Sequence, residues 1–136
     1  MSLLHQIAIT KINNVGPVSA KSIIAHLGSP EALWSASAAD LVAIPQIAQI
    51  TAQQILSDRD DALSRAEIEL KFIEKNKVST LYYLNDDYPR RLKYFDQSPV
   101  MLYYQGSANL NPQRNIGIVG TRKPSEYGVI QCEKIV

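Results

Sequence analysis

The sequence predicts a protein of the α+β or α/β class, with a helical domain over residues 1–76 and the beginning of an α/β domain over residues 77–136. Before Lys77, apolar residues recur at helical spacing, and the pattern repeats at an offset of 32 residues. After Lys77, apolar residues gather in short continuous runs, which are typical of strands buried on both faces of a mostly parallel sheet. The 136 residues are enough for one small domain and part of a second.

The composition is that of an ordinary globular protein. Hydrophobic residues make up 46% of the chain and charged residues 20%, which excludes disordered and collagen-like proteins. The net charge is +1, so overall charge argues neither for nor against nucleic acid. A single cysteine, Cys132, cannot form an internal disulfide, and a reducing, cytoplasmic location is the simplest expectation. No targeting or membrane-spanning segment is expected.

The opening segment reads as a succession of short helices. Apolar residues between positions 4 and 12 recur at helical spacing. The run 13–17 predicts a turn, because Asn and Gly tolerate positive φ. Apolar residues 20–27 form the stripe of the next helix, which Gly28 ends. Another short helix follows over residues 29–34.

Each copy of the repeat is a helix, a tight hairpin and a second helix. The matched pairs are Ile12 with Ile44, Val15 with Ile47, Ala20 with Ala52, and Ile23–Ile24 with Ile55–Leu56. The pattern resembles a pair of helix-hairpin-helix motifs, which are familiar from DNA repair and recombination proteins. In such motifs the hairpin presents backbone N–H groups to a DNA phosphate at the start of the second helix.

The first hairpin supplies candidates for a secondary DNA contact, namely Val15, Gly16 and Lys21, whose ammonium group adds a positive charge to the second helix. The alternative is that Lys21 is a solvated helix residue. The second hairpin, residues 46–48, lacks glycine and is expected only to pack. We favour a structural or partner-binding role for this domain over direct DNA binding.

A longer, charged helix is predicted over residues 60–76. Its main apolar stripe consists of Ala62, Leu63, Ala66, Leu70 and Ile73. Ile68 and Phe72 lie on the opposite side of the helical wheel, which suggests contact with the helical domain on one side and with the α/β part on the other. The alternative is partial exposure of Ile68.

Three apolar runs after Lys77 predict strands, at residues 81–84, 100–104 and 116–119. Between the first two, Pro89 fits the first turn of a short helix. The basic residues of this part form two groups, Arg90, Arg91 and Lys93, and Arg114 with Arg122 and Lys123. Any attraction for phosphate is therefore local to the last third of the chain.

The sharpest motif runs from Ile118 to Gly128 and predicts a strand, a small-residue turn and a helix. Doubly wound folds bind phosphate at such a turn, because glycine lets the backbone come close and the helix N-terminus supplies N–H donors. Gly120 is the turn glycine, and Arg122 and Lys123 add positive charge. The glycine spacing does not support a dinucleotide fingerprint. The alternative is that Gly120 only permits the turn and Arg122 is a surface residue.

Four segments of the second part follow one another in a specific order. They are the Tyr-Pro helix at 88–92, the Pro-led strand at 98–106, the Val-Gly-Thr-Arg turn within 117–122, and Ser-Glu-Tyr-Gly at 125–128. This order closely resembles the DNA-processing protein A family (DprA, also called Smf), and the helix-hairpin-helix region fits the family's N-terminal, SAM-like domain. The resemblance implies that the second part is the start of an extended Rossmann-like, doubly wound sheet.

The resemblance also implies a function. Such proteins bind single-stranded DNA and help to load the RecA recombinase on incoming DNA during natural transformation, when competent bacteria take up DNA. It implies a homodimer of the full-length protein. We expect no catalytic reaction and no metal, because the sequence shows no nucleophile–base pair and no metal-ligand cluster, and we expect no cofactor and no membrane partner. The resemblance places Arg122 in a basic pocket for DNA phosphates, with Gly120, Thr121 and Ser125 lining the turn and Lys123 beside it.

The alternative function is a Rossmann-like enzyme that binds a nucleotide or nucleoside phosphate at the Gly120–Arg122 turn. Such an enzyme needs an acidic ribose ligand or a catalytic carboxylate further along the chain. Because the sequence stops at Val136, inside the helix after the signature, we expect a fragment of a larger fold. We therefore expect weakened DNA binding, and either self-association through residues 100–136 or displacement of the last helix.

Overall fold

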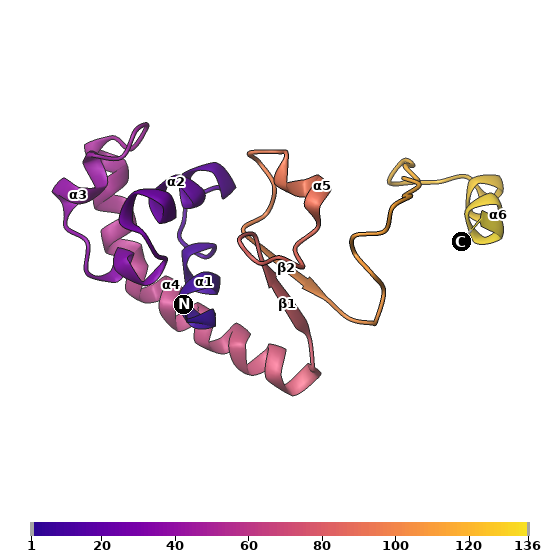
Figure 1. Ribbon diagram of the computed structural model, residues 1–136, viewed down its shortest axis with the longest axis horizontal. Coiled ribbons are helices and arrows are strands. Elements are labelled where there is room, and N and C mark those ends of the chain that lie inside the picture. The colour runs from indigo at the N-terminus through magenta and orange to yellow at the C-terminus, as the bar shows by residue number, and fades with distance from the viewer. Residues whose placement is uncertain (1, 136) are drawn as a thin grey trace.

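The computed structural model describes residues 2–135 as a helical body, a small sheet beside it and a separate C-terminal helix (Figure 1). The elements in chain order are α1 (Leu3–Ile9), α2 (Pro17–Leu27), the 3-10 helix η1 (Glu31–Trp34), α3 (Ala38–Val42), α4 (Gln49–Asn76), β1 (Ser79–Tyr82), α5 (Arg90–Lys93), β2 (Met101–Tyr104) and α6 (Glu126–Ile135). None of the helices in this described range is long and apolar enough to cross a membrane.

In the core, α1 and α3 pack against α4, and α2 packs against η1. Fully buried apolar side chains come from each of these elements, for example Ile7, Ile23, Leu33, Leu41 and Ile55. Helix α4 packs against α1 and carries three fully buried alanines, Ala52, Ala62 and Ala66, whose small side chains let neighbouring elements approach the helix closely. The predicted helical stripes are therefore confirmed as the core of the first part.

Helix α4 is a single helix of 28 residues, which differs from the prediction of a separate helix starting at residue 60. The second helix of the repeat continues into the charged helix because no glycine or proline stands between Gln49 and Asn76. The helix ends at Lys77, whose backbone is left-handed with φ 52°.

The second apolar side of α4 is largely uncovered. Ile68 is 69% exposed and Phe72 is 61% exposed, although both line a shallow groove beside Tyr103 of β2. The predicted contact of this side with the α/β part is therefore wrong for these two residues. Ile73, which belongs to the main apolar stripe, is buried and lines the same groove beside Val78 and Tyr103.

The two strands form an antiparallel pair, in which Leu81 faces Leu102 and Tyr82 faces Met101. The predicted parallel arrangement is wrong for this pair: the two strands run antiparallel, and the chain between them contains only the four-residue helix α5 and turns. Tyr88 fixes the return: it is fully buried, and its hydroxyl donates a hydrogen bond of 2.7 Å to the carbonyl oxygen of Pro99.

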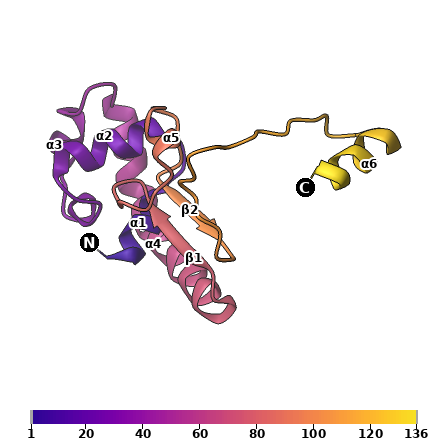
Figure 2. The ribbon, with the colours of Figure 1, turned by 45° about the vertical axis from the view of Figure 1, so that its right-hand side comes forward.

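The predicted third strand does not form. Residues 116–119 have no regular structure, and Ile116 and Val119 are 89% and 95% exposed. No neighbouring strand within residues 2–135 pairs with this segment, and a strand without a partner leaves its backbone groups without ladder hydrogen bonds. Figures 1 and 2 show the segment after β2 leading away from the body, with α6 apart from it at the end.

Candidate nucleic-acid interface

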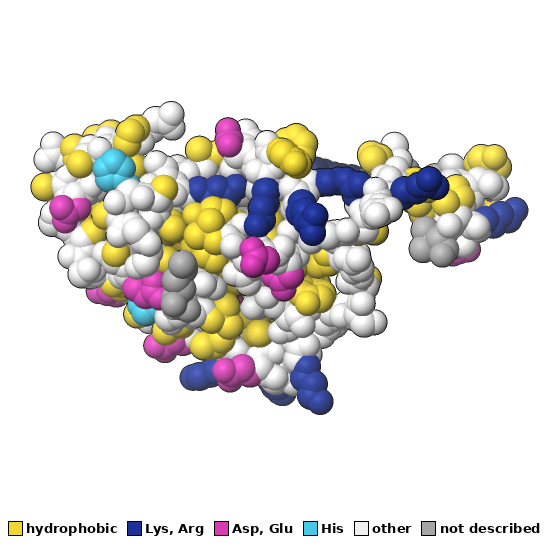
Figure 3. Space-filling view, in the orientation of Figure 1, with side chains coloured by type: hydrophobic (Ala, Val, Ile, Leu, Met, Phe, Trp, Pro, Cys, Tyr) yellow, Lys and Arg dark blue, Asp and Glu magenta, His cyan; other side chains and the backbone are white. Residues whose placement is uncertain are grey.

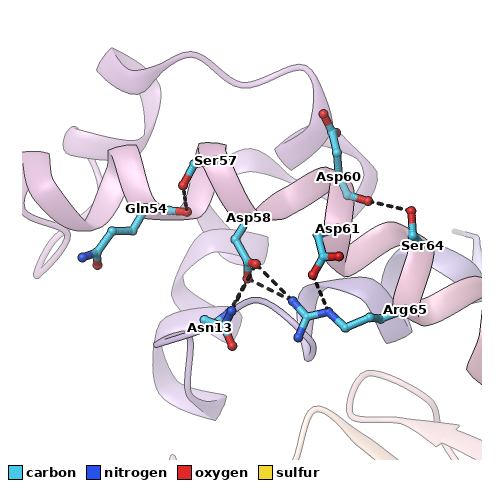
Figure 4. Close-up of polar contacts among 8 residues, drawn as sticks. All are labelled: Asn13, Gln54, Ser57, Asp58, Asp60, Asp61, Ser64 and Arg65. Carbon is cyan, nitrogen blue, oxygen red and sulfur yellow. Dashed lines mark hydrogen bonds and ion pairs between the residues drawn. The ribbon is translucent and has the colours of Figure 1, made fainter.

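The first hairpin is held to α4 by one carboxylate, that of Asp58 (Figure 4). Its two oxygens accept hydrogen bonds from the backbone N–H of Asn13 at 2.6 Å and from the Asn13 side-chain amide at 3.1 Å. The guanidinium of Arg65 donates to the same carboxylate at 3.1 and 3.2 Å and also pairs with Asp61 at 2.9 Å. This hairpin therefore has an internal anion as the partner of one of its backbone N–H groups.

Lys21, on the helix after this hairpin, contacts the second part of the chain. Its ammonium donates to the hydroxyl of Ser98 at 2.7 Å and to the carbonyl oxygen of Asp96 at 2.9 Å, and it lies 5.6 Å from the ring centre of Tyr83. Burial lowers the pKa of Lys21, and the nearby Asp96 carboxylate opposes that shift. These contacts favour a structural role for Lys21 over a phosphate contact.

The rest of the first hairpin also faces the sheet. Val15 and Gly16 line a small pocket of about 170 Å³ together with Pro99, Val100 and Met101. Gly16 itself is exposed, whereas Val15 is half-buried. The hairpin thus lies at the junction of the two parts of the chain.

The second hairpin is anchored by its apolar residues, since Ile44 and Ile47 are buried, while Gln46 between them is exposed with φ 70°. No lysine or arginine occurs between residues 22 and 58. A phosphate at this hairpin would have backbone N–H groups as donors but no cation nearby. The second hairpin therefore favours a packing role over phosphate binding.

The turn before α6 places Gly120, Thr121, Arg122, Lys123 and Ser125 together on an exposed loop. The Thr121 hydroxyl donates to the carbonyl oxygen of Lys123 at 2.8 Å. The Ser125 hydroxyl oxygen accepts from the N–H of Gly128 at 3.2 Å, which is the contact of a helix N-cap. Both hydroxyls therefore shape the turn and the start of α6.

The two cations of this turn are exposed. The side chains of Arg122 and Lys123 form no hydrogen bond or ion pair with any other residue in the range 2–135. They do not line the open groove of about 920 Å³ that the turn and α6 enclose. The groove is mainly apolar, and its lining residues include Ile118, Val119, Pro124, Val129 and Cys132.

The other basic group, on α5, is partly engaged in holding the loop before the turn. The Arg91 guanidinium donates to the carbonyl oxygens of Pro112 and Gln113 at 3.3 and 2.9 Å, and the Lys93 ammonium donates to that of Asn85 at 2.7 Å. The Arg90 guanidinium is left exposed. Figure 3 shows Lys and Arg side chains gathered across the middle of this face and toward α6.

Sequence reasoning missed Asn111, which ties the same loop to α5. Its side-chain oxygen accepts from the backbone N–H of Arg90 at 2.7 Å, and its amide donates to the carbonyl oxygen of Asp87 at 3.2 Å. An Asn in a loop gave only a turn signal, since these partners are more than 20 positions away.

Within residues 2–135, no group of three or more His, Cys, Asp or Glu side chains is placed to hold a metal ion. His5 packs its ring edge-to-face against Trp34, with 4.9 Å between ring centres, and His26 lies exposed on α2. The two histidines thus lie in separate settings within the helical part.

Comparison with protein-family models gives two matches. The model described as DNA recombination-mediator protein A matches residues 79–136, which include the sheet, α5, the turn and α6. The model of the SAM-like helix-hairpin-helix tandem matches residues 7–61, which cover both hairpins. Comparisons with curated proteins and with solved structures find no match. Residues 79–136 thus match the DNA recombination-mediator protein A (DprA) family, and they follow a SAM-like helix-hairpin-helix tandem over residues 7–61.

Proposed function

We propose that this chain binds single-stranded DNA through its phosphates at the turn formed by residues 120–125. The observation that carries the proposal is a pair of exposed cations, Arg122 and Lys123, which have no side-chain partner among residues 2–135. They lie beside the N-terminus of α6, within the segment that matches the recombination-mediator family. Guanidinium and ammonium groups form charge-assisted hydrogen bonds with phosphate oxygens. A helix N-terminus adds N–H donors and the favourable end of the helix dipole.

In this proposal the protein binds DNA and does not alter it chemically. The bound strand is passed to the RecA recombinase during natural transformation, in the cytoplasm, and the full-length protein acts as a homodimer without a cofactor. The family's description as a recombination mediator supports a role in delivering DNA to another protein. The position of the first hairpin, against the sheet and with Lys21 engaged, supports the turn over the hairpin as the main DNA contact.

Fluorescence anisotropy with a 30-nucleotide oligo-dT tests this site, starting at low salt where phosphate contacts are strongest. We expect Arg122→Ala to weaken binding by about 1–3 kcal/mol, or roughly 5- to 150-fold. The log–log salt slope should fall by about 0.7, the value for one phosphate contact on a single strand.

Lys75→Ala is the matched control, because Lys75 is an exposed cation at the far end of α4. It should bind like the unaltered chain. Unchanged affinity of Arg122→Ala, or tighter binding to a blunt duplex than to oligo-dT, would contradict the proposal.

A further inference from the structure

The end of α5 carries two adjacent aromatic side chains that are almost free of packing. Tyr94 is 85% exposed and Phe95 is 64% exposed. They follow the three basic residues of α5, Arg90, Arg91 and Lys93. Two neighbouring aromatic rings in water, beside cations, are the combination that proteins use to stack the bases of a single strand while holding its backbone.

The backbone that presents these rings is fixed on both sides. Before them, Arg91 and Lys93 are bonded to carbonyl oxygens of neighbouring loops. After them, the Lys21 ammonium holds the carbonyl oxygen of Asp96. Within the turn, the N–H of Phe95 donates to the carbonyl oxygen of Leu92 at 3.0 Å. Rings on a fixed backbone lose less conformational entropy when a base stacks on them.

Charge alone does not make this surface a DNA site. The three cations of α5 are balanced by three nearby carboxylates, those of Asp86, Asp87 and Asp96. The Asp96 carboxylate acts on the Lys21 ammonium, and Asp86 and Asp87 line a pocket with Arg90. A ligand attracted only by positive charge therefore gains little binding free energy at this surface. The exposed rings of Tyr94 and Phe95, by contrast, leave their faces available to bases.

Further cations follow along the chain between this surface and the turn. Arg91 is bonded to the backbone of residues 112–113, directly before Arg114, and the chain continues to Arg122 and Lys123. A strand whose bases lie on the rings of α5 can thus run its phosphates along this segment (Figure 3).

We infer that Tyr94 and Phe95 form a base-stacking site for single-stranded DNA, separate from the phosphate contacts at residues 120–125. The inference rests on the proposed function, which supplies the strand. The stacking site adds a contact with bases that does not depend on the DNA sequence, because every base has a face on which a ring can stack. Since stacking involves no phosphate, it contributes affinity without adding to the salt slope.

Two oligonucleotides separate stacking from phosphate binding: a 30-nucleotide oligo-dT and a 30-nucleotide abasic strand with the same number of phosphates. We expect the double variant Tyr94→Ala/Phe95→Ala to bind oligo-dT about tenfold more weakly or worse, with an unchanged salt slope. Its binding to the abasic strand should equal that of the unaltered chain. Arg122→Ala should weaken binding to both strands. Phe72→Ala, which removes an exposed ring on α4, should change neither.

A second variant keeps the test independent of folding. Tyr94→Trp retains a ring and should bind oligo-dT like the unaltered chain, with indole fluorescence quenched by oligo-dT and not by the abasic strand. Normal oligo-dT binding by the double variant, or equal quenching by both strands, would overturn the stacking site. If Arg122→Ala still weakens binding in that case, the proposed function stands without it. If the unaltered chain binds neither strand at low salt, the proposed function fails, and the stacking site fails with it.

Discussion

The ammonium nitrogen of Lys21 lies 2.7 Å from the hydroxyl oxygen of Ser98, a residue 77 positions further along the chain. Ser98 is only 5% exposed, so this contact gives a buried hydroxyl its partner. The same ammonium also holds the carbonyl oxygen of Asp96. A side chain that the sequence offers as a candidate for DNA binding thus joins the helical part to the segment before β2.

Removing this contact should affect stability and leave DNA binding nearly intact. Lys21→Ala takes the donor away from two oxygens, one of them buried, and we expect a loss of about 1–3 kcal/mol in the free energy of unfolding. Urea denaturation measures the loss, and Lys71→Ala, an exposed cation on α4, is the control. A fall in oligo-dT affinity as large as that of Arg122→Ala would show that the hairpin is a main DNA contact.

Asp58 should be the most sensitive acidic residue of α4. Asp58→Ala leaves the backbone N–H of Asn13 and the Arg65 guanidinium without their shared partner, and we expect a loss of about 1–3 kcal/mol. Asp60→Ala, two positions along the same helix, removes an exposed carboxylate and should change stability by less than about 0.5 kcal/mol. Equal unfolding midpoints for the two variants in urea would mean that the Asp58 contacts do not stabilise the hairpin.

The Tyr88 hydroxyl should contribute measurably to the second part of the fold. Tyr88→Phe keeps the ring in the core and removes the hydrogen bond to Pro99, so we expect a loss of about 1 kcal/mol. Tyr94→Phe is the matched control, because the Tyr94 side chain is exposed and its hydroxyl contacts water. Thermal unfolding of both variants tests this, and an equal melting temperature for the two would rule out a contribution from the bond.

The exposed apolar residues near the end of the chain should cause self-association. Ile116 and Val119 precede α6, on which Ile130 and Ile135 are also exposed, and such a surface favours pairing with another copy. Size-exclusion chromatography with light scattering should show a mass that rises with concentration. The variant Val119→Lys should reduce the rise, whereas Ile50→Lys, at an exposed position of α4, should not. A constant monomer mass would contradict this expectation.

The helical part could be predicted because its signals are local. Apolar spacing placed Ala62 and Ala66 on the packed face of α4, and Gly28 ends α2 with φ 85°, as a C-terminal glycine should. The sheet could not, because an apolar run indicates burial and does not encode the direction or presence of its partner. Residues 81–84 and 116–119 look alike in sequence, yet part of the first pairs with β2 and the second has no neighbouring strand in the described chain.

The candidate site divides in the same way. The turn at residues 120–125 can be predicted as a candidate site because its motif is contiguous, and Arg122 and Lys123 are exposed. The roles of Lys21, Asp58 and Asn111 depend on partners 21 to 77 positions away, which no local pattern reveals. Tyr94 and Phe95 gave no signal either, because an aromatic pair after a short helix is most often part of a core.

Helix α4 has a mechanical consequence. Its 28 residues extend for about 42 Å, from the second hairpin to the edge of the sheet, without a kink-forming residue. Because the helix has no break, we expect any movement of the sheet relative to the helical part to pivot at Lys77, where the helix ends. The Lys21 contact with Asp96 and Ser98 is a second point of support across that pivot. Tyr82, Val100 and Met101 also pack in the same core as the helical residues, so the sheet keeps apolar contacts with the helical part when Lys21 is replaced.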